Sequence, residues 1–283
     1  MKLYGLLGKN IAYSLSPAIH NAAFRALGMD ARYDVFDREK NELEEFFREL
    51  KSRRIAGCNI TIPHKEDSLE FMDECDSVAG DVGSVNTVFF EEGVLKGYNT
   101  DCYGFIKALT GKDVGDLGFN PRGKDAIVFG AGGAGRAVLE SLLTLGIKKL
   151  AIVDIDTEKA ERLANSISAR RENTVITVIE DKDKQNEFVS KAHLLVNATS
   201  CGRKPEDEHL FDYRYITGDA HVFDLIYTAD TSLVKKAKFR GAKAVNGLNM
   251  LLYQAAESFK IWTGIKNAPL AVMRKVVMGE ISK

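Results

Sequence analysis

The sequence predicts an α/β protein of two domains, and three observations carry that prediction. At 283 residues the chain lies in the range where one hydrophobic core stops growing and a second domain forms. Strand and helix patterns alternate along both halves, as is typical of α/β folds. In the second half, the apolar run Ala126–Phe129 leads into the glycine-rich turn Gly130–Gly135, which indicates a Rossmann-type doubly wound sheet.

The composition favours a small molecule as the partner. The 39 basic residues nearly balance the 40 acidic ones, and a formal net charge of -1 provides no field to attract nucleic acid or a membrane surface. The cysteines are scattered without a C-x-x-C pair, and no apolar stretch approaches the ~18 residues of a membrane span. We therefore expect a soluble, cytoplasmic protein. The histidines lack the spacing of metal ligands, so we expect no metal.

Alternating patterns in the first hundred residues predict a separate α/β domain with a parallel sheet. The predicted elements are a strand at Lys2–Gly8, a helix at Pro17–Leu27, a strand at Arg32–Phe36, a helix at Leu43–Lys51 and a strand at Gly57–Ile62. A hairpin through Glu91–Gly93 and a helix at Cys102–Leu109 follow. Because ligands of open α/β sheets bind at the carboxyl ends of the strands, polar residues at those ends are candidates for a site.

The first polar group follows the first strand. Ser14 and Ser16 stand just before Pro17, which suits the first turn of a helix. The two hydroxyls can bind a ligand, but Ser16 can equally be the N-cap of that helix. From these residues alone both roles stay open.

The second polar group lies at 58–65, at the end of the third predicted strand. Alternation places Asn59 and Thr61 on the same side of the strand, and Pro63 ends the ladder before Lys65. A lysine at a helix start is usually a solvated surface residue. A cation is mildly unfavourable at a helix N-terminus, however, which favours a functional role for Lys65.

The third polar group comprises Ser84–Thr87, which contains Asn86, and Asn99–Asp101 beyond the predicted hairpin. Taken singly, Asp101 is best explained as the cap of the helix that follows it.

The turn at 130–135 has the spacing of a dinucleotide-binding site. Its residues are Gly130, Ala131, Gly132, Gly133, Ala134 and Gly135, with three glycines at G-x-G-x-x-G positions. These glycines allow a tight turn, close backbone approach to a pyrophosphate and close packing of helix on strand. A helix at Val138–Leu145 and a strand at Lys149–Val153 follow, and Asp154 at the end of that strand can accept hydrogen bonds from an adenosine ribose.

The remaining elements complete the doubly wound sheet. They are a helix at Thr157–Ser168, strands at Val175–Ile179, Leu194–Asn197, Val222–Tyr227 and Lys243–Val245, and helices at Leu248–Thr263 and Pro269–Met278. The charge run Asp181–Glu187 is most simply a solvated helix start.

Six separated motifs occur in a consistent order along the chain. They are SxSPxxHN at 14–21, NxTxPxK at 59–65, VNT at 85–87, NTD at 99–101, GAGGAGRA at 130–137 and NGLNMLLYQA at 246–255. In these motifs the chain resembles the shikimate dehydrogenase family over essentially its whole length. The resemblance implies a substrate-binding catalytic domain at 1–104 plus 250–283 and a Rossmann dinucleotide-binding domain at 105–249. The C-terminal helix would then return to the first domain.

The resemblance also implies a reaction, the reversible reduction of 3-dehydroshikimate to shikimate with a nicotinamide cofactor, on the route to chorismate and the aromatic amino acids. Its substrate-binding residues would be Ser14 and Ser16 for the carboxylate, and Asn59, Thr61, Lys65, Asn86, Asp101, Tyr227 and Gln254 for the rest of the molecule. Ala198 and Thr199 of an Asn-Ala-Thr loop, together with Gly247, would join the glycine-rich turn in binding the cofactor.

Lys65 and Asp101 would be the catalytic pair, meeting across a cleft that faces the nicotinamide. Hydride arriving at the C3 ketone produces an alkoxide, and an ammonium within ~3 Å of that oxygen can stabilise and protonate it. Asp101 would hold the ammonium in place.

The expected cofactor is NAD. Members of the family that use NADP commonly carry Asn-Arg-Thr after the second strand of the Rossmann domain, whereas this chain has Asp154-Ile155-Asp156. The arginine for the 2′-phosphate is missing, and two carboxylates, Asp154 and Asp156, would repel that phosphate. At ~4 Å and an effective dielectric constant of ~20, such a repulsion is ~4 kcal/mol before screening. Arg203 could reach a cofactor phosphate, so NADP stays an alternative.

Other functions remain open at this point. NAD use also fits a quinate/shikimate dehydrogenase of quinate catabolism, although the paired serines favour shikimate. A non-catalytic dinucleotide sensor is the alternative of another class, but a sensor requires neither Lys65 nor Asp101. Methylene-tetrahydrofolate dehydrogenases share the two-domain design, but the serines and the Asn-Thr-Asp motif do not suit a pterin. We expect a monomer or a homodimer.

Overall fold

The computed structural model describes residues 1–52, 54–170, 173–204, 207, 209–227 and 230–281. The chain forms two compact units. Unit 1 comprises Met1–Gly104 and Leu252–Lys283, and unit 2 comprises Phe105–Leu251. Two helices, α4 (Thr100–Thr110) and α9 (Leu248–Thr263), begin in one unit and end in the other.

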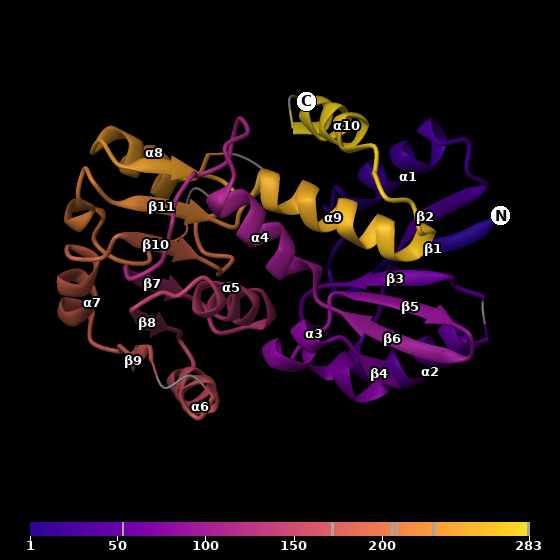
Figure 1. Ribbon diagram of the computed structural model, residues 1–283, viewed down its shortest axis with the longest axis horizontal. Coiled ribbons are helices and arrows are strands. Elements are labelled where there is room, and N and C mark those ends of the chain that lie inside the picture. Colours follow the sequence, from indigo (N-terminus) through magenta and orange to yellow (C-terminus); the bar gives the residue numbers. More distant parts are fainter. Residues whose placement is uncertain (53, 171–172, 205–206, 208, 228–229, 282–283) are drawn as a thin grey trace. The chain divides into compact units, whose positions relative to one another are not determined.

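Unit 1 is a mixed sheet with helices on both faces (Figure 1). Its further elements are β1 (Lys2–Gly8), α1 (Ser16–Ala26), β2 (Ala31–Asp37), α2 (Leu43–Lys51), β3 (Gly57–Ile60), β4 (Glu74–Cys75), α3 (Ser77–Val82), β5 (Thr87–Glu91), β6 (Val94–Tyr98) and α10 (Leu270–Ile281). The strand order is β2-β1-β3-β5-β6-β4. Strands β2, β1 and β3 are parallel as predicted, but the hairpin β5–β6 runs antiparallel to β3, so the sheet is not parallel throughout.

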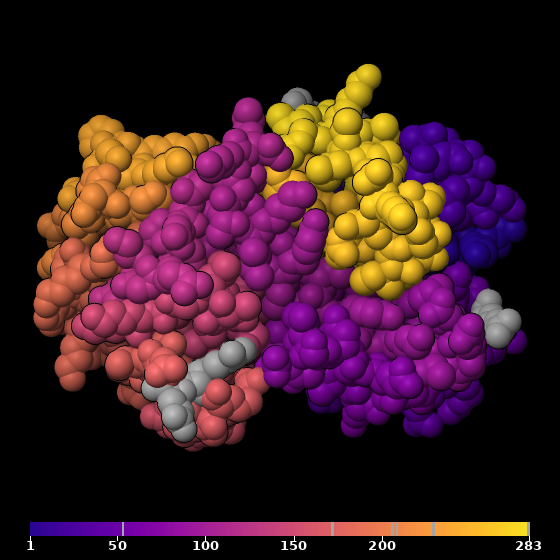
Figure 2. All heavy atoms as spheres, viewed as in Figure 1, coloured from indigo at the N-terminus to yellow at the C-terminus, as the bar shows by residue number. Residues whose placement is uncertain are grey.

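The two faces of this sheet carry different cores. On one face α2 buries Leu43, Phe46, Phe47 and Leu50, whose spacing forms a single stripe along the helix. On the other face α1 and α9 pack with the aromatic residues of β1 and β2, and Trp262 of α9 donates a hydrogen bond to the carbonyl of Val88. Helix α10 packs against α1, so a helix from the C-terminal part of the chain lies against one from the N-terminal part (Figure 2).

Unit 2 is an all-parallel sheet in the order β12-β11-β10-β7-β8-β9. Its further elements are β7 (Asp125–Phe129), α5 (Gly133–Thr144), β8 (Lys149–Val153), α6 (Thr157–Ser168), β9 (Val175–Val178), α7 (Lys182–Val189), β10 (Leu194–Asn197), β11 (His221–Asp224), α8 (Ser232–Phe239) and β12 (Lys243–Val245). This is the doubly wound order of a dinucleotide-binding fold, with its switch point between β7 and β10.

Two predicted strands end at least two residues earlier in the structure, and β9 ends one residue earlier, at Val178. The strand predicted at Gly57–Ile62 stops at Ile60, because the chain turns there and the amide of His64 bonds back to the carbonyl of Thr61. The strand predicted at Val222–Tyr227 stops at Asp224, whose carboxylate accepts a hydrogen bond from the amide of Ile226 and so removes that amide from the ladder.

Several helices begin earlier than predicted or have no counterpart in the prediction. Helix α5 starts at Gly133, inside the glycine-rich turn. Helices α3 and α8 were not expected, since each is short and buries few apolar side chains. Each nevertheless has an N-cap signal, because Asp76 accepts from the amide of Ala79 and Thr231 from the amide of Val234.

Candidate active site

The polar loops of unit 1 gather at the carboxyl ends of β1 and β3, which are neighbours in the sheet. The amide of Lys9 donates to the carbonyl of Ile62, and the amide of Thr61 donates to the carbonyl of Leu7, so these backbone bonds hold the two loops together. Strand β1 is paired with β2 on one side and with β3 on the other, so the strand order reverses at β1. Open α/β sheets bind ligands at such a topological switch point.

Ser14 and Ser16 lie in the loop after β1. Ser16 is the first residue of α1 and not its N-cap, which is Leu15, so the capping role that the sequence left open for Ser16 is wrong. The hydroxyl of Ser14 accepts a hydrogen bond from the amide of Ser16 at 3.2 Å. The side chain of Ser16 is buried.

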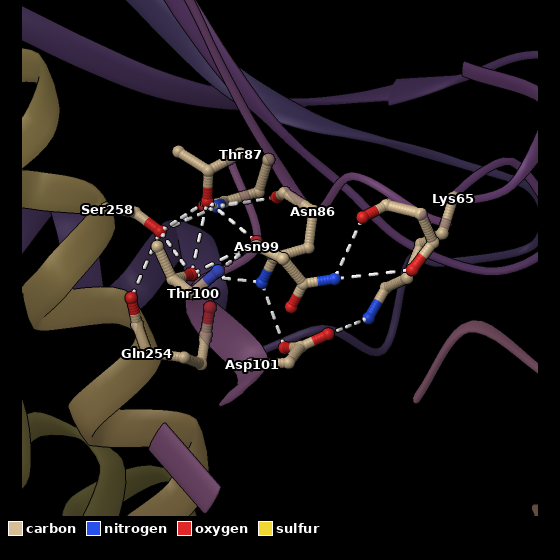
Figure 3. A network of polar contacts seen from close by, with 10 residues as sticks. Lys65, Asn86, Thr87, Asn99, Thr100, Asp101, Gln254 and Ser258 are labelled. Atoms are coloured by element: carbon tan, nitrogen blue, oxygen red, sulfur yellow. Dashed lines mark hydrogen bonds and ion pairs between the residues drawn. The ribbon is translucent and has the colours of Figure 1, made fainter. Parts of the chain in front are cut away.

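Lys65 and Asp101, 36 residues apart in sequence, form an ion pair in unit 1 (Figure 3). Their Nζ and Oδ2 atoms are 2.5 Å apart, and their side chains are 15% and 9% exposed. Asp101 lies in the first turn of α4 and is not the cap of that helix, because α4 already begins at Thr100. The cap prediction is therefore wrong. Partial burial strengthens the interaction between the two charges and keeps the ammonium in one place.

Asn86 holds the carboxylate of this pair. Its Nδ2 donates to Asp101 Oδ1 at 2.9 Å and to the hydroxyl of Thr100 at 3.0 Å. Its Oδ1 accepts from the amide of Thr100 at 2.7 Å, which satisfies one of the free amides at the start of α4. Asp101 thus accepts a hydrogen bond from the side-chain amide of Asn86 on Oδ1 and one from the ammonium of Lys65 on Oδ2.

Asn59 is buried, and its side chain is hydrogen-bonded to other residues of the protein. Its Oδ1 accepts from the hydroxyl of Tyr33 at 2.8 Å, and its Nδ2 donates to the carbonyl of Asn86 at 3.1 Å. Thr61 is half-buried beside Gly8, and Gln254 is half-buried on α9, one turn before Ser258. The structure therefore collects Ser14, Ser16, Asn59, Thr61, Lys65, Asn86, Asp101 and Gln254 in unit 1.

The glycine-rich turn of unit 2 leads directly into α5. Gly130 has φ 106°, in the region that favours glycine, and a Cβ there would lie 3.0 Å from the carbonyl of Ala198. A Cβ on Gly135 would collide with the carbonyl oxygen of Gly130. Gly132 is the N-cap of α5, so Gly133, Ala134 and Gly135 form its first turn. These glycines leave the amides at the start of the helix open to an anion.

Asp154 follows β8 and reaches back to that turn. Its Oδ2 accepts from the amide of Ala131 at 2.6 Å, and its Oδ1 accepts from the amide of Asp156 at 2.9 Å. Asp156 caps α6 by accepting from the amide of Lys159, while Ile155 between the two aspartates is fully exposed.

The loops after β10 and β11 meet at the buried carboxylate of Asp224. Asn197 Nδ2 donates to it at 3.0 Å, and Asn197 Oδ1 in turn accepts from the amide of Thr199. Burial raises the pKa of Asp224 to about 6. Gly247 packs against the backbone of Leu225, where a Cβ would collide with a carbonyl oxygen.

The residues expected to bind a cofactor all belong to unit 2. They are Gly130, Ala131, Gly132, Gly133, Ala134, Gly135, Asp154, Asp156, Ala198, Thr199 and Gly247. Tyr227, half-buried after β11, is the one expected substrate residue in this unit.

Three residues of these networks were missed from the sequence. Tyr33 donates to Asn59 from β2, Ser258 contacts Asn59 from α9, and Asp224 supports the Asn-Ala-Thr loop. A signal exists for Ser258, which is four residues after Gln254 and so on the same face of the helix. Within the described residues no group of three or more His, Cys, Asp or Glu could hold a metal, and no helix is long and apolar enough to cross a membrane.

Comparison with known proteins identifies the family. A model described as the shikimate dehydrogenase substrate binding domain matches residues 6–88, and one described as the shikimate 5′-dehydrogenase C-terminal domain matches residues 247–278. The shikimate dehydrogenase (NADP(+)) of Desulforamulus reducens is 38% identical over 282 residues, which cover 99% of this chain and 95% of the relative. The chain belongs to the shikimate dehydrogenase family. The enzyme of the same name from Methanopyrus kandleri is 39% identical, with 97% of this chain and 94% of the relative covered.

Solved structures of the family share the fold. The shikimate dehydrogenase of Aquifex aeolicus superimposes with a TM-score of 0.87 at 38% identity, covering 98% of this chain and 97% of the other. The shikimate 5-dehydrogenase of Listeria monocytogenes, in complex with shikimate and NAD, has a TM-score of 0.87 at 31% identity and coverage of 98% and 96%. The quinate dehydrogenase of Corynebacterium glutamicum, in complex with NAD, has a TM-score of 0.87 at 30% identity and coverage of 98% and 99%. The predicted family, fold class and assignment to the oxidoreductases are confirmed.

Proposed function

We propose that this chain catalyses reversible hydride transfer between a nicotinamide dinucleotide and C3 of shikimate, interconverting shikimate and 3-dehydroshikimate. The observation that carries the proposal is the ion pair of Lys65 and Asp101, held by Asn86 within a cluster of polar loops. Residues 1–104 with 250–283 would bind the substrate, and residues 105–249 the cofactor. The relatives named above support both the substrate and the cofactor class.

The chemistry follows from where the two charges sit. The nicotinamide, when bound, supplies or receives the hydride. The ammonium of Lys65 stabilises the negative charge that develops on the C3 oxygen and donates the proton to it, while in the oxidative direction the same nitrogen takes the proton back. Asp101 orients that nitrogen through Oδ2, and Asn86 prevents the carboxylate from turning by binding Oδ1. Hydroxyls of Ser14 and Ser16 suit the substrate carboxylate as donors.

The glycine-rich turn suits a dinucleotide, and the structure favours NAD over NADP. Gly130 and Gly135 allow the close backbone approach that a pyrophosphate needs. Asp154 is held beside this turn by the amide of Ala131, where its carboxylate can accept the ribose hydroxyls and repel a 2′-phosphate. Curated relatives are named for NADP(+), and the structural neighbours include complexes with NADP as well as with NAD, so the preference needs a direct test.

Steady-state kinetics of the purified protein on shikimate and on quinate, each with NAD and with NADP, tests the proposal. We expect shikimate-dependent reduction with a higher kcat/KM for NAD than for NADP. A higher kcat/KM with NADP refutes the cofactor preference without affecting the reaction. Absence of shikimate-dependent and of quinate-dependent reduction with either cofactor refutes the catalytic function and favours the sensor.

A quinate/shikimate dehydrogenase is the second candidate, favoured by the carboxylate at Asp154 and by the NAD-bound quinate dehydrogenase among the structural neighbours. The two serines favour shikimate, because quinate carries an additional C1 hydroxyl that requires more space. A kcat/KM for quinate that equals or exceeds the value for shikimate would establish the second candidate. A cytoplasmic location also stays a proposal, supported by the four cysteines, which form no disulfide within the described residues.

A further inference from the structure

Three buried hydroxyls from distant parts of the chain meet beside the Lys65–Asp101 pair (Figure 3). Thr87 begins β5, Thr100 begins α4 and Ser258 lies in the third turn of α9. Their oxygens are 2.8 Å apart between Thr87 and Ser258, 3.0 Å between Thr100 and Ser258 and 3.2 Å between Thr87 and Thr100. None of the three is more than 3% exposed, so water does not compete for these hydrogen bonds.

This hydroxyl cluster, Thr87, Thr100 and Ser258, is linked to the catalytic carboxylate by one residue. Asn86 accepts from the amide of Thr100 and donates to its hydroxyl, and the same Nδ2 donates to Asp101. The position of Thr100 therefore sets the orientation of Asn86, and the orientation of Asn86 in turn sets that of Asp101. Thr100 in turn is fixed from the other side by Ser258.

Ser258 is the member that joins the cluster to another element. Its hydroxyl contacts Thr87 and Thr100, accepts from Asn59 Nδ2 at 3.0 Å and lies 3.0 Å from the carbonyl of Gln254, one turn earlier in α9. The side chain of Gln254 is expected to contact the substrate. One hydroxyl thus ties the helix that carries Gln254 to the two strands and the helix start that position Asp101.

We propose that Ser258 is a positioning residue for the reaction: its hydroxyl locks α9 onto the network that orients Asp101, and so keeps Asp101 and Gln254 at the spacing that the substrate requires. The inference rests on the proposed function, because it assigns a role within that reaction. Ser258 does not itself touch the reacting atoms, so its effect passes through Thr100 and Asn86.

The test is Ser258→Ala, with Ser141→Ala as the matched control. Ser141 is also a buried helical serine, but its hydroxyl bonds to the carbonyl of Ala137 in its own helix and has no role assigned to it here. We expect Ser258→Ala to lower kcat for shikimate oxidation roughly tenfold, as for a disrupted buried network, with the KM for the dinucleotide unchanged. Ser141→Ala should keep the wild-type kcat.

Two readouts separate positioning from a general loss of stability. The solvent isotope effect on kcat should rise in Ser258→Ala, because proton transfer at Lys65 becomes more rate-limiting. In a double-mutant cycle with Thr100→Val, the losses of kcat should not add, because both residues act through Asn86. If Ser258→Ala does not fold, Ser258→Cys keeps the shape with a weaker hydrogen-bonding group and should show the same loss of kcat at a native melting temperature.

A folded Ser258→Ala variant whose kcat is within twofold of the wild-type value overturns the inference, as do additive losses in the cycle. These outcomes are distinct from a failure of the proposed function, in which the wild-type protein itself does not oxidise shikimate. That last result would overturn both.

Discussion

The stability of unit 1 should fall steeply with acid because of one buried histidine. The imidazole of His20, on α1, is fully buried between the rings of Tyr33, Phe259 and Trp262. Within the described residues neither ring nitrogen has a hydrogen-bond partner. A charged imidazolium in this setting would lose its hydration without gaining a hydrogen bond. Burial accordingly lowers the pKa of His20 from 6.5 to about 3.

The sign and size of the effect follow from proton linkage. The unfolded chain protonates this histidine below its ordinary pKa, whereas the folded chain does not until far lower pH. The stabilisation is therefore fully present above pH ~6.5 and is lost as the pH falls toward ~3. Between pH 7 and pH 4.5, a shift from 6.5 to about 3 corresponds to a loss of about 2.5 kcal/mol in the free energy of unfolding.

The assay uses the only tryptophan of the chain, Trp262, whose ring centroid is 5.2 Å from that of His20. Urea unfolding followed by its fluorescence reports on unit 1, and wild type is compared with His20→Leu at both pH values. Contributions from carboxylates are shared by the two proteins and cancel in the comparison. We expect the wild type to lose about 2.5 kcal/mol more than the variant on going from pH 7 to pH 4.5. Equal losses in the two proteins would refute the reasoning.

Three further predictions concern catalysis, the cofactor and the other unit. Lys65→Ala should lower kcat by roughly 10²–10⁴ with cofactor affinity nearly intact, and near-wild-type turnover in initial-rate assays would remove Lys65 from the mechanism. The variant Asp154→Asn/Ile155→Arg/Asp156→Thr, which recreates Asn-Arg-Thr, should shift the ratio of kcat/KM for NADP over NAD at least tenfold toward NADP. An unchanged ratio would show that these residues do not set the preference. For Asp224, a pKa raised from 3.8 to about 6 means that the fold disfavours its charge, so the stability it contributes falls as the pH rises from 4 to 7. Relative to Asp224→Asn, the wild type should lose about 2.5 kcal/mol over that range in urea unfolding followed by circular dichroism, and a parallel pH dependence of the two proteins would contradict the assignment.

Elements with a strong apolar period could be predicted almost to the residue. The stripe of Leu43, Phe46, Phe47 and Leu50 located α2, and β1 and β8 have the predicted bounds. Helix α8 was missed because its buried residues are few and its lysines dominate the local pattern. Strand ends were less predictable than strand centres, since β11 stops where the Asp224 side chain takes over a backbone amide, which no periodicity reveals.

The site shows the same limit in another form. Motif positions located the polar residues at the strand ends, but they could not tell which partner each amide takes. The prediction that Asn59 and Asn86 contact a substrate did not include the protein groups that their amides also bind, which are Tyr33, Thr100 and Asp101. Tyr33 is 26 residues before Asn59, in a strand that carries no motif, so its hydroxyl could be placed only once the sheet order was known.

The two units hold their polar residues in place by different means. This difference predicts which substitutions each unit can tolerate. In unit 1 the carboxylate of Asp101 depends on buried side chains that bond to one another, so a single substitution leaves a buried partner unsatisfied. In unit 2 the turn is shaped by the backbone of Gly130 and Gly135. Asp154, Ile155 and Asp156 lie outside the core, and Asn and Thr can replace the two aspartates while still accepting hydrogen bonds from the amides that they bind. Cofactor preference should therefore diverge within this family more readily than the Lys65–Asp101 pair. Relatives named for NADP(+) and structural neighbours that hold NAD, at 30–39% identity to the same chain, fit that expectation.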